Sequence, residues 1–118
     1  MLSDVARIVM QDRTLAGPLE GATNVGTCGE PGNGAYVRIW LKILNGRILA
    51  AASATHGCPS SQAASAMTAK LVTGRGVEQA LRLTGQDVVL VLGGLPEGKG
   101  HFADMAVSAL RSALEQEE

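Results

Sequence analysis

The sequence predicts an α+β fold: a small antiparallel sheet of about three strands, with helices packed on one face. Two observations support this prediction. An alternating apolar segment turns back on itself at an Asn-Gly pair, and segments with helical features precede and follow that hairpin. The length of 118 residues suits one compact domain, so we expect a single domain over residues 1–118.

The N-terminal part of the chain predicts a short helix followed by a loop. Leu2, Val5 and Val9 recur at helical spacing within residues 2–12, which is typical of a short amphipathic helix. Residues 17–34 are rich in Gly, Pro, Asn and Thr, and this composition predicts a loop with at most one short edge strand. Loops of this kind often carry function.

The next segment, residues 35–44, is the most clearly predicted strand. Its apolar and polar side chains alternate with a period of two, which indicates one buried face. Asn45-Gly46 supplies the positive φ angles that a two-residue hairpin turn needs. The returning strand over residues 47–57 is expected to place these side chains on one face: Ile48, Ala50, Ala52 and Ala54. The sheet face away from the helices is expected to be wetter and to carry Arg38, Trp40 and Lys42.

The rest of the chain is predicted to be mainly helical. Pro59 suits the first helical position, so a helix is expected to begin at or just after Cys58 and to end before Gly74. Residues 77–83 are a short helix candidate, whereas the apolar run within 85–100 does not distinguish helix from strand by its periodicity. A longer amphipathic helix is predicted from His101 to Glu117.

Composition excludes several classes of function. The formal net charge is −1 and there is no basic run, so we expect no nucleic-acid binding. No apolar run is long enough to cross a bilayer, and early acidic residues argue against a signal peptide. We therefore expect a soluble, cytoplasmic protein that acts away from membranes. Its two cysteines are too few for a disulfide framework, so in a reducing compartment they remain thiols open to metal binding or catalysis.

Cys58 is the first candidate for chemistry. It stands where a predicted strand ends and a predicted helix begins, so the helix dipole and the free N–H groups of the first turn should lower the pKa of its thiol. A thiolate ligates metal or attacks a sulfur or carbon electrophile. The alternative is a buried thiol that only caps the helix.

Four soft or borderline metal ligands are present: Cys28, His56, Cys58 and His101. Two Cys and two His suffice in number for a four-coordinate zinc site or an unusual two-iron cluster, although their spacing matches no zinc-finger pattern. Each has an alternative interpretation: His56 as a half-buried sheet residue, and His101 as a surface residue at a helix start. Cys28 lies in the predicted loop beside Glu30, whose carboxylate is either an oxygen ligand or a solvated charge.

The segment GCPSSQAASAMTAKLVTGR resembles the region around the second ligand cysteine of the IscU/NifU-type iron–sulfur cluster scaffold proteins, with Cys58 as the matching cysteine. The hairpin leading to Cys58 is similar to the second and third strands of that family, where an aromatic residue more often stands at the position of His56. In the family, a Leu-Pro turn leads to a His-Cys pair that opens the last helix. Here the same spacing leads to His101-Phe102, so the His is retained and the Cys is replaced. The resemblance covers about residues 24–114 and implies the family's fold.

The family's first ligand cysteine stands in a Gly-x-Pro-x-Cys-Gly-Asp loop before the strand. A gapless match, which we prefer, places Asn33 at that cysteine and Ala35 at the aspartate. A second alignment places Cys28 and Glu30 on the Cys-Gly-Asp motif and treats the next five residues as an insertion. The second alignment restores one thiol and one acid.

The resemblance implies a divergent scaffold or carrier for iron or a [2Fe–2S] cluster rather than an enzyme. Cys58 would accept sulfur or ligate metal, His101 would be a nearby ligand, and Cys28 would be a second thiolate. Phe102 supplies no ligand, so the complete ligand set of the family is absent. A cluster would then need a further donor, His56 or Glu30, or two chains would share one cluster as a homo-oligomer. The implied partners are a cysteine desulfurase and proteins that receive the cluster.

Two other functions remain open from the sequence. The first alternative is that the chain is a degenerate paralogue that kept the fold and binds a protein or zinc without assembling a cluster. A third hypothesis is a small thiol enzyme with Cys58 as nucleophile and His56 or His101 as base. We rank the scaffold or carrier first, the paralogue second and the enzyme last.

Overall fold

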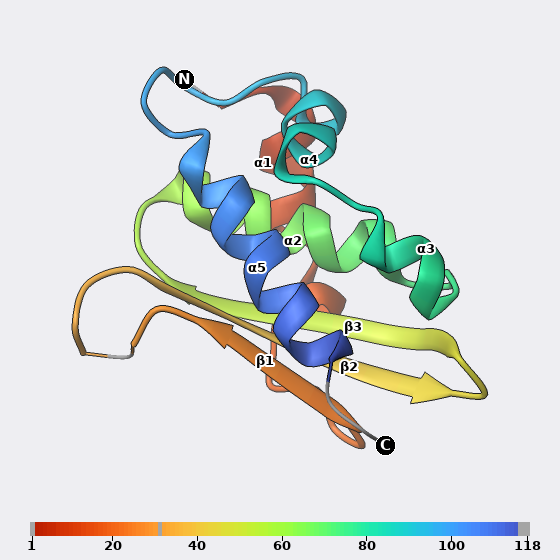
Figure 1. Cartoon of the computed structure of the whole chain (residues 1–118). Helices are drawn as coiled ribbons and strands as arrows, with labels where there is room; N and C mark the ends of the chain where they lie inside the picture. The colour runs from red at the N-terminus through yellow and green to blue at the C-terminus, as the bar shows by residue number, and fades with distance from the viewer. Residues whose placement is uncertain (1, 31, 116–118) are drawn as a thin grey trace.

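The computed structural model describes residues 2–30 and 32–115. The elements in chain order are α1 Asp4–Met10, the 3-10 helix η1 Arg13–Leu15, β1 Asn24–Cys28, β2 Tyr36–Leu44, β3 Arg47–His56, α2 Pro59–Val72, α3 Val77–Leu81, α4 Gly85–Leu92 and α5 His101–Leu114. The strands form one antiparallel sheet in the order β1-β2-β3. Helices α2 and α5 pack on one face of this sheet, and α4 lies on their far side (Figure 1). The predicted α+β fold is confirmed.

The core between the sheet and the helices is built from small and branched aliphatic side chains. The buried face of β2 consists of Val37, Ile39, Leu41 and Ile43, as its alternation predicted. Many of the buried residues of α2 and α5 are alanines, whose small side chains let the helices approach the sheet closely. Gly26 of β1 shows how close: a Cβ atom there would lie 2.1 Å from the carbonyl oxygen of Ala109 in α5.

The hairpin turn has the predicted geometry, but β3 carries a bulge that changes which residues face the core. Asn45 and Gly46 have φ angles of 53° and 74°. The register then shifts, so that Ile48 lies opposite Ile43 while Ala50 lies opposite Lys42. The extra residue reverses the alternation beyond it, so the expectation that Ile48, Ala50, Ala52 and Ala54 share one face is wrong. After the bulge, the residues opposite the buried positions of β2 are Ala51, Ser53 and Thr55.

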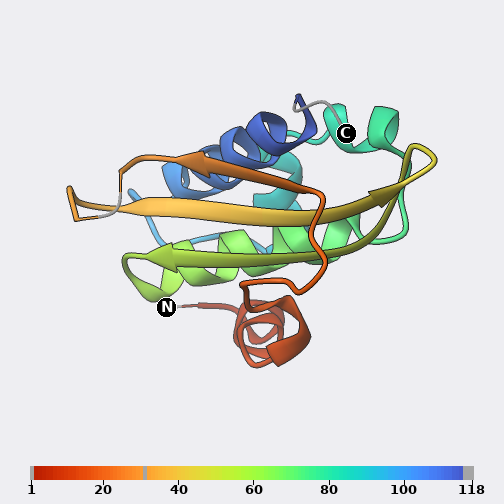
Figure 2. The same ribbon diagram turned by 90° about the horizontal axis from the view of Figure 1, so that it is seen from below.

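The open face of the sheet is partly covered by the chain between η1 and β1. This segment leaves the outer edge of β3, where the N–H of Gly17 donates to the carbonyl of Ser53 at 2.9 Å, and crosses the sheet toward β1 (Figure 2). A Cβ atom at Gly17 would lie 2.4 Å from the ring of Trp40. Trp40 is therefore half-buried and Ala52 fully buried, whereas Lys42 is exposed as expected for a wet face.

The helices follow the predicted pattern with shorter bounds. The first helix begins at Asp4, with Ser3 as its N-cap accepting from the N–H of Ala6 at 3.1 Å. The run that periodicity left undecided contains α4, which ends at Gly93 with a left-handed φ of 79°. The last residues of the predicted C-terminal helix, 116 and 117, lie outside the described part of the chain. No helix of the described residues has the length and apolar character needed to cross a membrane.

Candidate functional site

The topology brings several sequence-predicted site residues to one end of the molecule. The C-terminal ends of β1 and β3 lie at the same end of the sheet because Cys28 is opposite Val37, which is opposite Thr55. The N-terminal ends of α2 and α5 lie at this same end (Figure 1). We call it the cysteine end and define it as Cys28, residues 32–35, His56 to Cys58, and Lys99 to Phe102.

Cys58 is the N-cap of α2, with Pro59 at the first helical position as predicted. Its side chain is half-buried against the edge of the core and forms no disulfide. Burial raises the pKa of the Cys58 thiol, but the backbone N–H groups of Ser61 and Ser60, the positive charge of Lys99 and the Ser60 hydroxyl together outweigh it. The net result is a pKa below the ordinary thiol range, so the fold favours a thiolate at this position, as the sequence predicted.

Lys99 is the functional candidate that the sequence analysis missed. It is half-buried in the turn before α5, and its charge lowers the pKa of Cys58. Its Nζ atom also lies 5.8 Å from the centroid of the Phe102 ring, within the range of a cation–π contact. The sequence carried a weak signal, a lysine two residues before the ligand-type His101. A lysine near a ligand-type residue is common on protein surfaces, so this signal by itself does not indicate a role for Lys99.

A hydrogen-bonded pair fixes the backbone behind Cys58. The hydroxyl groups of Thr55 and Ser61 lie 2.6 Å apart, and Thr55 also donates to the carbonyl of Tyr36 at 2.7 Å. These bonds tie the end of β3 to the first turn of α2. Gly57 stands between them, and a Cβ atom there would approach the Ser61 hydroxyl to 3.0 Å. The position of Cys58 is thus set by contacts on both sides of it.

The other predicted ligands lie at half-buried or exposed positions. Cys28 is half-buried at the end of β1, while Glu30 is exposed in the following loop. His56 is exposed and stacks on Tyr36, with ring centroids 6.3 Å apart. His101 is exposed and its ring lies 4.1 Å from that of its neighbour Phe102.

Within residues 2–30 and 32–115, no three side chains of His, Cys, Asp or Glu are grouped closely enough to hold a metal ion. The structure therefore brings Cys28, Cys58 and His101 to one end of the molecule without forming a complete ligand set there. Which of them ligate metal stays a prediction.

Phe102 has a structural role in the core. Its side chain is 8% exposed and belongs to the main hydrophobic cluster. Asn33 and Ala35, by contrast, are exposed in the loop before β2. The residue at the start of α5 that the resemblance pairs with a ligand cysteine is therefore an apolar contact in this chain.

Comparison with known proteins connects this geometry to one family. The family model described as the NifU-like N-terminal domain matches residues 3–117. The iron–sulfur cluster assembly scaffold protein IscU 1 of Archaeoglobus fulgidus is 36% identical over 114 residues, covering 97% of this chain and 74% of that protein. The IscU scaffold protein of Aquifex aeolicus is 36% identical over 100 residues, covering 83% of this chain and 64% of that protein.

Solved structures agree with the fold. A protein of Fervidobacterium islandicum AW-1, assigned as a cluster assembly scaffold for the SUF system, superposes with a TM-score of 0.68 at 17% identity. That match covers 96% of each chain. The N-terminal part of a NifU-like protein from Brucella abortus gives a TM-score of 0.55 at 25% identity, covering 91% of this chain and 74% of the other.

Proposed function

Because the chain belongs to the NifU-like N-terminal domain family, we propose that it is a scaffold or carrier in iron–sulfur cluster assembly, with Cys58 as its central residue. The observation that supports this most directly is the environment of Cys58. A half-buried thiol at a helix N-terminus, with a lysine charge nearby, has its pKa lowered and is available as a thiolate. Both sulfur transfer and metal ligation use that form.

Sulfur delivery to Cys58 follows as a displacement at sulfur. The Cys58 thiolate attacks the terminal sulfur of a persulfide on a donor protein, so that a new S–S bond forms as the donor's S–S bond breaks. The donor sulfur leaves as a thiolate with the electron pair of the broken bond. The step needs no external oxidant, and Lys99 offsets the negative charge that stays at Cys58. The donor we propose is a cysteine desulfurase, and the assembled cluster would pass to recipient proteins.

Ligation of the cluster, which is cargo here, would use Cys58 with His101 and Cys28. His101 is exposed, and Cys28 reaches the same end of the sheet from β1. Imidazole replaces thiolate on one iron of Rieske centres, so a mixed Cys/His set is chemically reasonable. His56 and Glu30 are further donors at or next to the cysteine end. A complete set requires either movement of these side chains toward Cys58 or a contribution from a second chain.

The second candidate is a paralogue that binds a protein or zinc without assembling a cluster. The burial of Phe102 favours it, because this position supplies core packing instead of a thiolate. On this proposal Cys58 would ligate zinc or would only cap α2. The two candidates differ in whether sulfide accompanies the metal.

The test is the content of iron, zinc and acid-labile sulfide per chain in anaerobically purified protein, before and after reconstitution with a desulfurase, cysteine and ferrous iron. The parent is compared with Cys58→Ala and with the matched variant Cys28→Ala. Mass spectrometry detects the added sulfur of a Cys58 persulfide. Iron and sulfide that are lost in Cys58→Ala support the scaffold. Zinc alone, or neither metal nor sulfide after reconstitution, contradicts the scaffold and favours the paralogue.

A further inference from the structure

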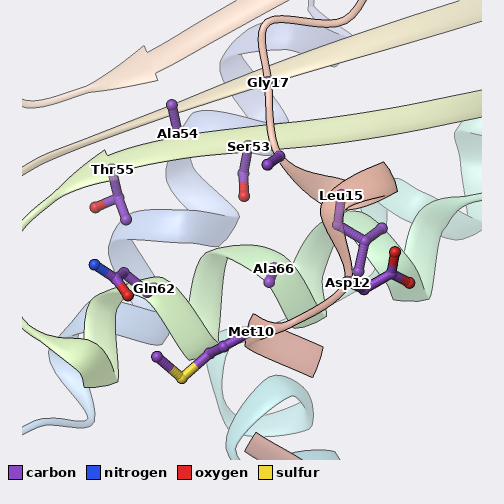
Figure 3. Close-up of a pocket in the computed structure, with 10 residues that line it drawn as sticks. Met10, Asp12, Leu15, Gly17, Ser53, Ala54, Thr55, Gln62 and Ala66 are labelled. Carbon is purple, nitrogen blue, oxygen red and sulfur yellow. The ribbon is translucent and has the colours of Figure 1, made fainter. Parts of the chain in front are cut away.

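A crevice along the outer edge of β3 has features of a binding site that lies apart from Cys58. It has a volume of about 280 Å³ and lies between α1, η1, β3 and α2. Figure 3 shows its lining, in which Met10, Leu15 and Ala66 are apolar and Ser53, Thr55 and Gln62 are polar. Ligand pockets usually range from about 300 to 1,000 Å³, so this crevice suits a short segment better than a cofactor.

Ser53 supplies a polar group that the fold itself does not use. Its side chain is 9% exposed and, on the core side of β3, points toward α2 into the crevice (Figure 3). The hydroxyl has no hydrogen-bond partner within the described residues and is not sealed from solvent, so it is open to a ligand in the crevice. A ligand in the crevice would satisfy it.

The backbone beside Ser53 is also open to pairing. The Ser53 carbonyl points away from β2, because it accepts from the N–H of Gly17. In an antiparallel pair, residues two apart point their backbone groups the same way, so the N–H and C=O of Thr55 also point outward. Neither group has a hydrogen-bond partner in the part of the chain that the structure describes. Ala16 forms a parallel bridge with Ser53, and the chain leaves this edge after Gly17. The edge beside Thr55 is therefore not occupied by this segment.

We propose that this crevice binds an extended peptide segment of another protein as an added strand on β3. The segment pairs its backbone with Thr55, hydrogen-bonds the Ser53 hydroxyl, and places a small apolar side chain against Met10, Leu15 and Ala66. Strand addition to an exposed sheet edge is a common mode of peptide recognition, in which main-chain bonds give affinity and side pockets give specificity.

The charge of the rim agrees with a peptide partner. Among the residues that line the crevice, Asp12 alone is ionisable, and its carboxylate accepts from the N–H and the hydroxyl of Thr14 at 3.0 and 2.6 Å. These bonds, together with the nearby positive charge of Lys70, hold the pKa of Asp12 below its usual range, so the carboxylate is ionised at neutral pH. A basic side chain flanking the apolar one could pair with this carboxylate.

The experiment selects binders from a phage-displayed library of random peptides and maps a synthetic binder by amide chemical shifts. We expect shifts at Ser53, Thr55 and Gln62, and a loss of affinity of about tenfold or more in Ala66→Phe, which fills the crevice. Ser108→Phe is the matched control, because it adds the same side chain to the groove between α4 and α5. A binder that shifts other amides, equal affinity of Ala66→Phe and the parent, or a library without binders overturns the proposal.

A second measurement uses the unmodified protein and so does not depend on the folding of a variant. Methylating one peptide nitrogen at a time should lower affinity at the residue that pairs with Thr55 but not at its immediate neighbours, because adjacent residues of a strand point their N–H groups to opposite sides. A loss at no position, or equal losses at adjacent positions, excludes strand addition.

Two further controls separate this site from others. Binding should persist in Cys58→Ala, so the peptide site and the scaffold function can fail independently. If the same amides shift when the protein alone is concentrated, the occupant is a second copy of this chain and the proposal is wrong.

Discussion

The hydroxyl groups of Thr55 and Ser61 lie 2.6 Å apart and join the end of β3 to the first turn of α2. Between them in sequence lies Cys58, so this partly buried contact holds the reactive residue between two fixed points. Thr55 and Ser61, which are not among the predicted metal ligands, therefore help to fix the position of the thiol. The first prediction tests this contact.

Ser61→Ala removes the hydrogen bond to Thr55 while Thr55 keeps its bond to the carbonyl of Tyr36. We expect the free energy of unfolding to fall by about 1 kcal/mol, the usual net value of one such bond. Urea unfolding measures this loss. The control is Ser108→Ala on the exposed face of α5, and equal losses in both variants would contradict the role assigned to Ser61.

Lys99→Met should raise the pKa of Cys58, because the variant removes a positive charge that stabilises the thiolate. The measurement is the rate of Cys58 alkylation against pH in a Cys28→Ala background. In the parent, the rate should rise at a lower pH than for an unstructured cysteine peptide, and the variant should shift the curve upward. Lys70→Met is the control, and an identical shift in both lysine variants would show that the effect is not local.

The same titration predicts a pH-dependent stability. The folded-state pKa of Cys58 is lowered, so the thiolate stabilises the folded protein above the unfolded-state pKa of about 8.5. This contribution is lost as the pH falls through the folded-state value. The difference in unfolding free energy between the parent and Cys58→Ala should therefore increase from neutral to alkaline pH. A difference that stays constant over this range would contradict the lowered pKa.

Phe102→Cys should restore a thiol where the family resemblance places one. The variant loses packing in the core at a cost of about 3 kcal/mol, so its unfolding temperature should fall. If the cysteine end binds a cluster, iron and sulfide per chain after reconstitution should exceed those of the parent. Phe102→Ser is the control, since it creates a similar cavity without a thiol. A gain in both variants, or in neither, would argue against ligation from this position.

Gly26→Ala should destabilise the contact between β1 and α5. The new Cβ atom would lie 2.1 Å from the Ala109 carbonyl oxygen and 2.3 Å from the backbone nitrogen of Ala113, so the helix must move. We expect a loss of about 1–3 kcal/mol, typical of overpacking, seen as a lower unfolding temperature. Gly100→Ala is the control, because nothing lies within 4 Å of its Cβ position. Equal effects of the two substitutions would show that the close approach is not strained.

Much of the fold was predictable because it depends on residues that are close in sequence. The alternation in 35–44, the positive φ angles at Asn45 and Gly46, and Pro59 at a helix start are local features, and each appears in the structure. The bulge in β3 was not predictable in this way. Ile48 and Leu49 are both apolar and small residues follow them, so the sequence gives no contrast between buried and exposed positions that would mark the extra residue.

The candidate site shows the same difference between local features and features that depend on tertiary contacts. Cys58 was identified from its position at a strand-to-helix junction, which is a local property. Lys99 was not, because its charge acts on Cys58 across the space between two helix starts that are far apart in sequence. The crevice beside Ser53 was also missed, since it depends on α1, η1, β3 and α2 meeting.

The sequence alone predicts most of the element types, the hairpin turn, the family resemblance and a thiol at a helix N-terminus, but it does not distinguish helix from strand in the run that contains α4. Tertiary contacts set which face of β3 is buried, place the segment after η1 over Trp40 and bring Phe102 into the core. The physical reason is the range of the interactions. Helix starts and tight turns are set by backbone geometry and neighbouring residues, whereas register, burial and the charge around Cys58 depend on contacts between segments that only the folded chain brings together.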